Sequence, residues 1–274
     1  MNCATLVPVT IRRAGLAAAN ALATLLLLSC AAAATPSTAG VPQLRVEVLA
    51  ELPHDPTAFT QGFEIADGVL YEGTGLGGRS QLRELDPQTG AVRRAAALPA
   101  PVFGEGITLV GDRIWQLTWR DGFAIEWDRA SLTKLREVSY DGEGWGLCND
   151  AGGRRLVMSD GTDRLQFRDP VSFAASGSVS VRMAGRPLTA LNELECVDGQ
   201  VWANVWQTDL IVRIDPASGE VTAAADAAGL LPASRRNGAD VLNGIAAVGS
   251  TGEFLVTGKL WPTTFRVRFV PAER

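Results

Sequence analysis

The sequence QLRELDPQTG, at residues 81–90, recurs with nearly the same chemistry as LIVRIDPASG at residues 210–219. The first half of each stretch has the largely alternating apolar and polar pattern of a strand with one buried face. The Asp-Pro-x-Thr/Ser-Gly sequence that follows predicts a turn, in which aspartate caps the backbone, proline sets φ and glycine adopts positive φ. Two more segments of this kind end at Asp128 and Asp169. The chain therefore repeats one strand-and-turn unit.

A second recurring segment marks the start of each unit. A polar residue, a small or polar residue and then an apolar residue recur five times between Phe63 and Ile245, in steps of about 45 residues. A second apolar strand and then the alternating strand follow each recurrence. The five segments are Gln61-Gly62-Phe63, Glu105-Gly106-Ile107, Gly144-Trp145-Gly146-Leu147, Asn192-Glu193-Leu194 and Asn243-Gly244-Ile245.

Units of about 40–50 residues with four strands each are typical of β-propeller blades. Five repeats therefore predict an all-β, five-bladed β-propeller. The last unit has no room for a fourth strand before Arg274, so the N-terminal strand at residues 44–48 is expected to complete the last blade and remove an exposed edge. Polar residues at the starts of the first strands are expected to converge near the axis. They are Gln61, Glu105, Glu143, Asn192 and Asn243.

The composition excludes several classes of protein. The chain has 274 residues, a net charge of −5 and 46% hydrophobic residues, which is typical of a folded globular protein without a nucleic-acid-binding patch. His54 is the single histidine, so a His-based zinc centre is excluded. We expect His54 to bond to local backbone near Asp55 and Pro56. No GxxxxGK[ST] phosphate loop occurs.

The N-terminal residues read as an export signal over residues 1–30, followed by a linker at 31–42 and a catalytic domain at 43–274. Arg12 and Arg13 precede an apolar run of signal-peptide length at residues 14–28. Leu27-Leu28-Ser29-Cys30 resembles a lipobox, and either lipidation of Cys30 or cleavage after a following alanine fits. A periplasmic or extracellular location is expected, with membrane attachment only through a lipid at Cys30.

Two cysteines, Cys148 and Cys196, lie within the body of the chain. In an oxidising compartment they could pair. The alternative, slightly favoured because two cysteines make no framework, is a pair of buried free thiols.

Seven motifs spread over residues 54–262 resemble the plant and bacterial type of glutaminyl-peptide cyclotransferase, or glutaminyl cyclase. As they stand here, they are HDPTAFTQG at 54–62, YEGTGL at 71–76, FGEGIT at 103–108, EGWGL at 143–147, LNELE at 191–195, WANVW at 202–206 and VTGKLWP at 256–262.

The resemblance implies a five-bladed propeller, and a reaction in which an N-terminal glutamine of a peptide or protein cyclises to pyroglutamate and releases ammonia. It assigns proton transfer to Glu105, polar contacts to Gln61, Asn192 and Lys259, and an aromatic wall to Phe59, Phe103, Trp119, Trp145 and Trp206. We expect catalysis to require no cofactor and no metal ligand, and a structural cation on the axis is compatible with the fold. A monomer is expected.

The residues themselves fit these roles. Glycines flank Glu105 and leave its carboxyl accessible, and nearby aromatic rings are expected to raise its pKa. We expect Lys259, or an amide of Asn192 or Gln61, to hold the carboxamide oxygen as charge develops there.

Two other functions remain open from the sequence. One is a metal-dependent propeller hydrolase of the lactonase kind, in which Glu105, Asn192 and Asn243 would hold a cation with a bound water. The other is a non-catalytic propeller that binds peptides.

Overall fold

The computed structural model describes residues 35–150 and 154–272. The predicted export signal and Cys30 lie outside this range. The described residues form strands and one short 3-10 helix, Ala233–Arg235, so the prediction of an all-β fold is confirmed. No helix within the described ranges is long and apolar enough to cross a membrane.

Three antiparallel sheets of four strands follow one another along the chain, and each covers one sequence repeat. The first comprises β2 (Thr60–Ala66), β3 (Val69–Thr74), β4 (Gln81–Leu85) and β5 (Val92–Ala97). The second comprises β6 (Gly104–Val110), β7 (Arg113–Thr118), β8 (Phe123–Asp128) and β9 (Thr133–Ser139). The third comprises β10 (Leu147–Asp150), β11 (Arg155–Ser159), β12 (Arg164–Arg168) and β13 (Ala175–Ser180).

The last two repeats share one eight-stranded sheet. Its first half is β16 (Leu191–Val197), β17 (Gln200–Val205), β18 (Leu210–Ile214) and β19 (Val221–Asp226). Its second half is β20 (Leu242–Ala247), β21 (Glu253–Gly258), β22 (Thr263–Pro271) and the N-terminal strand β1 (Gln43–Pro53). A separate two-stranded hairpin, β14 (Arg182–Met183) with β15 (Arg186–Pro187), precedes this sheet.

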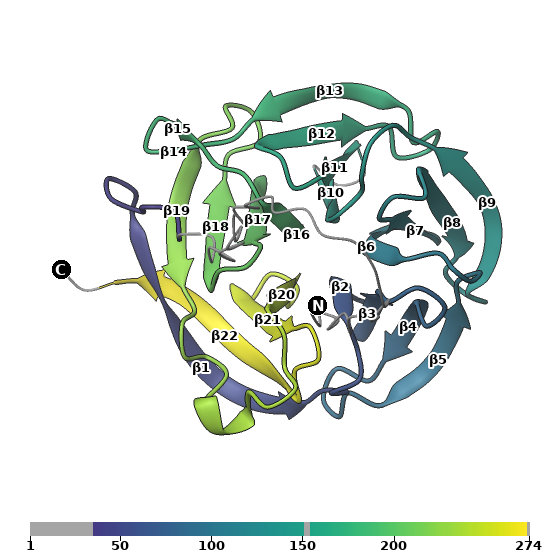
Figure 1. Cartoon of the computed structure of the whole chain (residues 1–274), viewed down its shortest axis with the longest axis horizontal. Helices are drawn as coiled ribbons and strands as arrows, with labels where there is room; N and C mark the ends of the chain where they lie inside the picture. The colour runs from purple at the N-terminus through teal and green to yellow at the C-terminus, as the bar shows by residue number, and fades with distance from the viewer. Residues whose placement is uncertain (1–34, 151–153, 273–274) are drawn as a thin grey trace, which may run out of the picture. The chain divides into compact units, whose positions relative to one another are not determined.

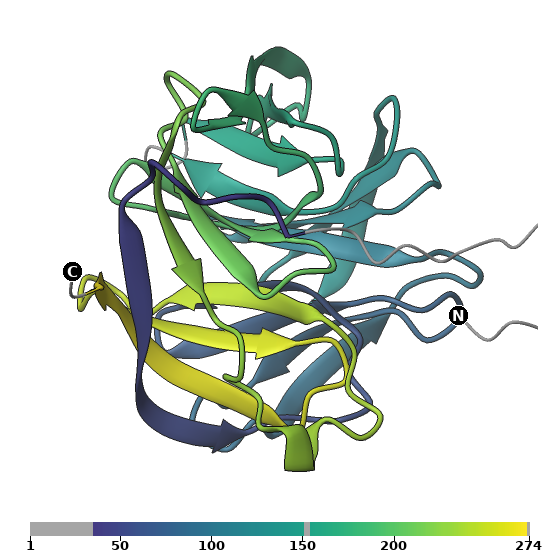
Figure 2. The same ribbon diagram turned by 60° about the vertical axis from the view of Figure 1, so that its left-hand side comes forward.

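Strand β1 completes the last repeat as predicted, because it pairs antiparallel with β22 from Leu44 opposite Pro271 to Pro53 opposite Thr263. Figure 2 shows the two strands, purple and yellow, side by side. The same strand also pairs in parallel with β19 over residues 43–45. This second pairing fuses the fourth and fifth repeats into one sheet, so the structure does not divide the strands into five separate sheets. The five-bladed count stays a prediction.

The first strand of every repeat lies at the centre of the arrangement (Figure 1). Strand β2 contacts β6 and β20, β10 contacts β6 and β16, and β16 contacts β20, so these five inner strands surround a common axis. Apolar side chains pack between neighbouring sheets, as where Trp115 lies against Phe173 with ring centroids 4.8 Å apart. The polar residues at the starts of the inner strands therefore lie around this axis, where they form the site.

The repeated turns have the predicted geometry. Asp86 Oδ1 accepts hydrogen bonds from the backbone of Gln88 and Thr89 at 3.0 and 2.9 Å. Gly90 and Gly219 adopt positive φ values of 66° and 76°. The local chemistry of the Asp-Pro-x-Thr/Ser-Gly motif thus sets the two bends that follow Asp86 and Asp215.

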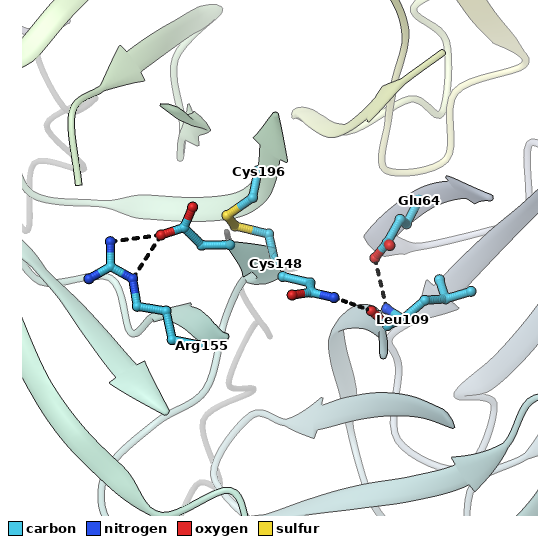
Figure 3. The surroundings of a disulfide bond; sticks show 7 residues. Glu64, Leu109, Cys148, Arg155 and Cys196 are labelled. Carbon is cyan, nitrogen blue, oxygen red and sulfur yellow. Dashed lines mark hydrogen bonds and ion pairs between the residues drawn. A yellow bond between two sulfur atoms is a disulfide. The ribbon is translucent and has the colours of Figure 1, made fainter. Parts of the chain in front are cut away.

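Cys148 of β10 and Cys196 of β16 form a disulfide with their Cα atoms 5.4 Å apart (Figure 3). The slight preference for free thiols was wrong, because the closed ring places inner strands of successive repeats side by side. Close by, the Asn149 side chain donates to the Leu109 carbonyl at 2.7 Å, and Glu64 accepts from the Leu109 N–H at 3.0 Å. Covalent and polar links therefore tie neighbouring inner strands together.

Candidate active site

The polar residue at the second position of four inner strands lies where the strand ladder is irregular. The register shifts between Thr60 and Gly62 in β2, Gly104 and Ile107 in β6, Leu191 and Leu194 in β16, and Leu242 and Ile245 in β20. Such bulges release a side chain from the regular alternation and re-aim it. The side chains freed in this way are Gln61, Glu105, Asn192 and Asn243.

The Glu105 carboxyl is the chemical centre of this group. Its residue is only 4% exposed, and its Oε1 accepts a hydrogen bond from Gln61 Nε2 at 2.9 Å. Its Oε2 has no hydrogen-bond partner within the described residues. Burial raises the pKa of Glu105 well above its usual value, the Lys259 charge opposes the rise, and the Glu143 charge adds to it. A buried carboxyl with one free oxygen can both accept and donate a proton.

The glycines beside Glu105 have a structural cause that the sequence did not reveal. A Cβ on Gly106 would stand 2.6 Å from the Leu147 nitrogen and 2.7 Å from the Trp145 oxygen. Glycine is required there because β6 approaches the segment leading into β10 at backbone distance. The expectation that the glycines leave the carboxyl accessible was wrong, because the Glu105 carboxyl is buried and the glycine flank reflects strand packing.

Asn243 fixes the orientation of Gln61. Its Nδ2 donates to the Thr60 carbonyl at 3.0 Å and to Gln61 Oε1 at 3.2 Å. Gln61 must therefore turn its amide nitrogen toward Glu105. The predicted convergence of Gln61, Glu105 and Asn243 is confirmed. Asn192 is buried at the equivalent place in β16, and its Oδ1 has no hydrogen-bond partner within residues 35–150 and 154–272.

Glu143 lies outside the hydrogen-bonded group formed by Gln61, Glu105 and Asn243, although its charge acts on Glu105. It precedes β10 by four residues, its side chain is 34% exposed, and no hydrogen bond links it to Gln61 or Glu105 in the described part of the chain. Its Oε2 instead accepts from the indole nitrogens of Trp119 and Trp145 at 2.8 and 3.0 Å, while Oε1 accepts from Arg120 Nε at 2.8 Å. Glu143 thus aligns two indoles.

The five aromatic residues predicted for a wall come together in two groups. Phe103 packs against Phe59 with ring centroids 6.0 Å apart, and against Trp119 at 5.5 Å. Trp145 meets Trp206 edge to face at 5.4 Å. Because Glu143 holds Trp119 and Trp145 through one oxygen, it joins the two groups. Trp206 is 36% exposed and lies at the outer limit of the wall.

Lys259 brings a buried positive charge to the site. The residue is 5% exposed, and its Nζ lies 5.0 Å from the centre of the Phe59 ring. No carboxylate of the described residues lies within ion-pair distance of it. Burial lowers the pKa of Lys259, while the charges of Glu105 and Asp240 act to raise it. The ammonium group is therefore free to meet a ligand.

Trp119, Trp206 and Lys259 occupy equivalent positions, because each is the first residue after the second strand of its repeat. In an antiparallel pair, the end of the second strand lies beside the start of the first. The loops that carry these residues therefore surround the ends of the inner strands that carry Gln61 and Glu105.

Comparison with known proteins agrees with this architecture. The sequence model of the glutamine cyclotransferase family matches residues 21–269. The chain is 41% identical over 233 residues to a glutaminyl-peptide cyclotransferase of Arabidopsis thaliana, covering 83% of this chain and 72% of that protein. It superposes on the crystal structure of Myxococcus xanthus glutaminyl cyclase with a TM-score of 0.78 and 36% identity, covering 85% of this chain and all of that one.

These matches define a class of all-β acyltransferases. The chain belongs to the glutamine cyclotransferase family. The family prediction made from the seven motifs is confirmed, and family, relative and structure together support a glutaminyl-peptide cyclotransferase function.

Proposed function

We propose that this protein converts the N-terminal glutamine of peptides and proteins into pyroglutamate, with Glu105 as general acid and base. The observation that carries the proposal is the buried Glu105 carboxyl, held at one oxygen by Gln61 and free at the other. Nothing in the reaction requires an external nucleophile, because the substrate supplies both the amine and the carbonyl that it attacks.

The free Oε2 of Glu105 accepts a proton from the substrate α-amine as the amine nitrogen attacks the side-chain carboxamide carbon. A new C–N bond closes the ring, the carboxamide C–N bond breaks, and Glu105 returns the proton to the departing nitrogen, which leaves as ammonia. The raised pKa of Glu105 suits both proton transfers, because it lies closer to the pKa values of the nitrogens with which Glu105 exchanges the proton.

The unpaired polar atoms of the site match the substrate. Glu105 Oε2 and Asn192 Oδ1 are free acceptors, and an N-terminal glutamine offers N–H donors from its amine and its carboxamide. The Lys259 ammonium is a free donor that would stabilise the carboxamide oxygen as it gains negative charge. This donor and acceptor balance favours Lys259 over the Gln61 amide, which is already bound to Glu105.

The aromatic wall would hold the glutamine side chain folded back on its own amine. Phe59, Phe103, Trp119, Trp145 and Trp206 supply apolar faces around the polar group. Holding two reacting groups of one molecule at attack distance removes much of the entropic barrier to ring closure.

The finer points of the fold and setting are part of the same proposal. The cyclic contacts of the five inner strands and the pairing of β1 with β22 support a five-bladed propeller, in which β1 bridges the last two blades. We expect a monomer that works without a cofactor, exported to the periplasm or outside the cell. A lipid at Cys30 and a structural cation on the axis remain predictions from the sequence.

The test is incubation of the chelator-treated protein with a peptide that begins with glutamine, beside the same peptide beginning with asparagine. We expect the glutamine peptide alone to lose the mass of one ammonia. Glu105→Gln keeps the shape of the side chain and should lower kcat by about 10²–10⁴-fold. Binding without mass loss would identify a peptide-binding protein, and activity restored only by added metal would identify metal-dependent chemistry.

A further inference from the structure

The ring of His54 has both nitrogens against hydrogen-bond acceptors. Nδ1 lies 2.7 Å from the Trp261 carbonyl oxygen, and Nε2 lies 3.1 Å from Glu72 Oε1. The side chains of His54 and Glu72 are 3% and 0% exposed. A carbonyl oxygen can only accept and an ionised carboxylate can only accept, so the geometry fits an imidazolium that donates from both nitrogens. The expectation that His54 bonds to nearby backbone was wrong.

The contacts of His54 connect two segments that carry site residues. Its backbone N–H donates to the Pro262 carbonyl at 3.2 Å, and the Leu260 N–H donates to the Ala58 carbonyl at 2.7 Å. The segment that leads to Phe59 is thereby bound along the turn that follows Lys259. Leu260 adopts a φ of 60°, which a leucine seldom occupies unless its surroundings hold it there.

On the Nε2 side of its ring, His54 is connected through Glu72 to the first inner strand, β2. Glu72 in β3 also accepts a hydrogen bond from Thr60 Oγ1 at 2.7 Å, next to Gln61. Its second oxygen lies 3.6 Å from Arg83 Nη1 in β4, and Arg83 donates to Asp55 at 2.9 Å. Negative and positive charges therefore alternate from Glu72 to Arg83 to Asp55. A positively charged His54 ring extends this alternation at the Glu72 end.

We propose that His54, as an imidazolium, is a positioning residue for catalysis: it fastens the Lys259–Trp261 turn to β2 and β3 and so holds the Lys259 ammonium over Phe59. The role rests on the proposed function to the extent that Lys259 binds the carboxamide oxygen. The charge state of the ring does not rest on it.

The electrostatic surroundings agree with this geometry. Burial disfavours the charged ring, but the hydrogen bond and charge of Glu72 and the Trp261 carbonyl together raise the pKa of His54. Burial acts to raise the pKa of Glu72, yet His54 and Arg83 lower it. A raised folded-state pKa means that the contribution of His54 to stability is complete below its unfolded pKa of about 6.5, whereas the contribution of Glu72, whose pKa is lowered, is lost as the pH falls through the folded-state pKa of Glu72. The stabilisation by charged His54 is lost at the alkaline side, as the pH rises through the folded-state pKa of His54.

A direct test uses the fact that the chain has one histidine. With a purification tag that lacks histidine, ¹⁵N-histidine labelling gives the signals of one imidazole in the intact protein. We expect both ring nitrogens to be protonated at pH 7, with a titration midpoint above the ordinary value. Glu72→Gln should lower that midpoint. A neutral ring at pH 7, or a midpoint unaffected by Glu72→Gln, would overturn the proposed charge state.

Kinetics test the positioning role. His54→Asn keeps a donor near the position of Nδ1, whereas His54→Gln places its donor toward Glu72. We expect His54→Gln to lower kcat on the order of 10- to 100-fold with a smaller change in KM, and His54→Asn to retain more of kcat. In the wild type, deprotonation of the ring should lower kcat as the pH rises through the pKa of His54, and this alkaline decline should be absent from both variants.

Asp150→Asn is the matched control for loss of a buried ion pair. Asp150 is 4% exposed and its Oδ2 lies 2.7 Å from Arg155 Nη2, at the end of β10 away from the site. We expect this variant to lose stability and keep kcat. Equal kcat in His54→Gln and the wild type would overturn the positioning role. If Lys259→Gln leaves kcat unchanged, the role of Lys259 in the proposed function fails, while the labelling result still decides the state of His54.

Discussion

Glu143 offers a sharp test of how the aromatic wall is held, because one of its oxygens accepts from two indoles. Glu143→Ala removes both bonds from Trp119 and Trp145. A hydrogen bond to a charged group contributes about 1.5–3 kcal/mol when buried, and the lower value applies to a side chain that is 34% exposed. Two such bonds give about 3 kcal/mol, or up to about 100-fold in kcat/KM. The loss should appear in KM and in kcat, because the indoles bind the substrate and hold it folded for attack.

Glu143→Gln is the matched control. Its carbonyl oxygen can take the position of Oε2 and keep both indole bonds, while its amide faces Arg120 at the surface. We expect most of kcat/KM to be retained. The charge of Glu143 raises the pKa of Glu105, so both variants should lower that pKa and move the acid limb of kcat/KM to lower pH.

Ammonia release from one glutamine-initiated peptide, followed across pH, measures both effects, and the use of a single peptide keeps the substrate amine constant. If Glu143→Ala leaves kcat/KM at the wild-type value, the indoles do not depend on this carboxylate. If neither variant moves the acid limb, Glu143 does not act on Glu105 through its charge.

Two further perturbations test the hydrogen bonds that join Asn243, Gln61 and Glu105, and the disulfide that joins two inner strands. Asn243→Asp replaces the donor to Gln61 Oε1 with a carboxylate. It should therefore raise the pKa of Glu105 and move the acid limb of kcat/KM to higher pH, which is the opposite of the shift expected for Glu143→Gln. An acid limb that does not move in the same peptide assay would show that Gln61 does not need Asn243. Replacing both Cys148 and Cys196 by serine opens a loop with a sequence separation of 48 residues, which should cost about 4 kcal/mol and lower Tm by roughly 8–16 °C. Thermal unfolding with and without reductant measures this loss, and a variant as stable as the oxidised protein would refute it.

The features that were predictable from sequence are those formed by neighbours in the chain. The Asp86 turn closes on the backbone of Gln88 and Thr89, so its chemistry is visible within one motif. Gln61 and Glu105 were placed together because they recur at the same point of two repeats, and the repeats fold alike. Periodicity therefore carried part of the site as well as the strands.

The features that were missed depend on closure of the ring. The Nδ1 contact of His54 is with Trp261, 207 residues away, and β1 reaches β19 across most of the chain. No local pattern encodes such pairs, because each partner has an ordinary alternative nearby: a histidine can bond to its own loop, and a strand edge can face water. Only the closed arrangement makes the distant partner available.

The repeats also show how one backbone position serves different chemistry. The residue after the second strand is Gly75 in the first repeat, Trp119 in the second, Trp206 in the fourth and Lys259 in the fifth. A Cβ on Gly75 would stand 2.4 Å from the Phe103 ring, so glycine there makes room for a wall residue that comes from the next repeat. The backbone fixes where each side chain stands around the inner strands. The differences among repeats, which break the sequence pattern, determine whether that place provides space, an apolar face or a charge.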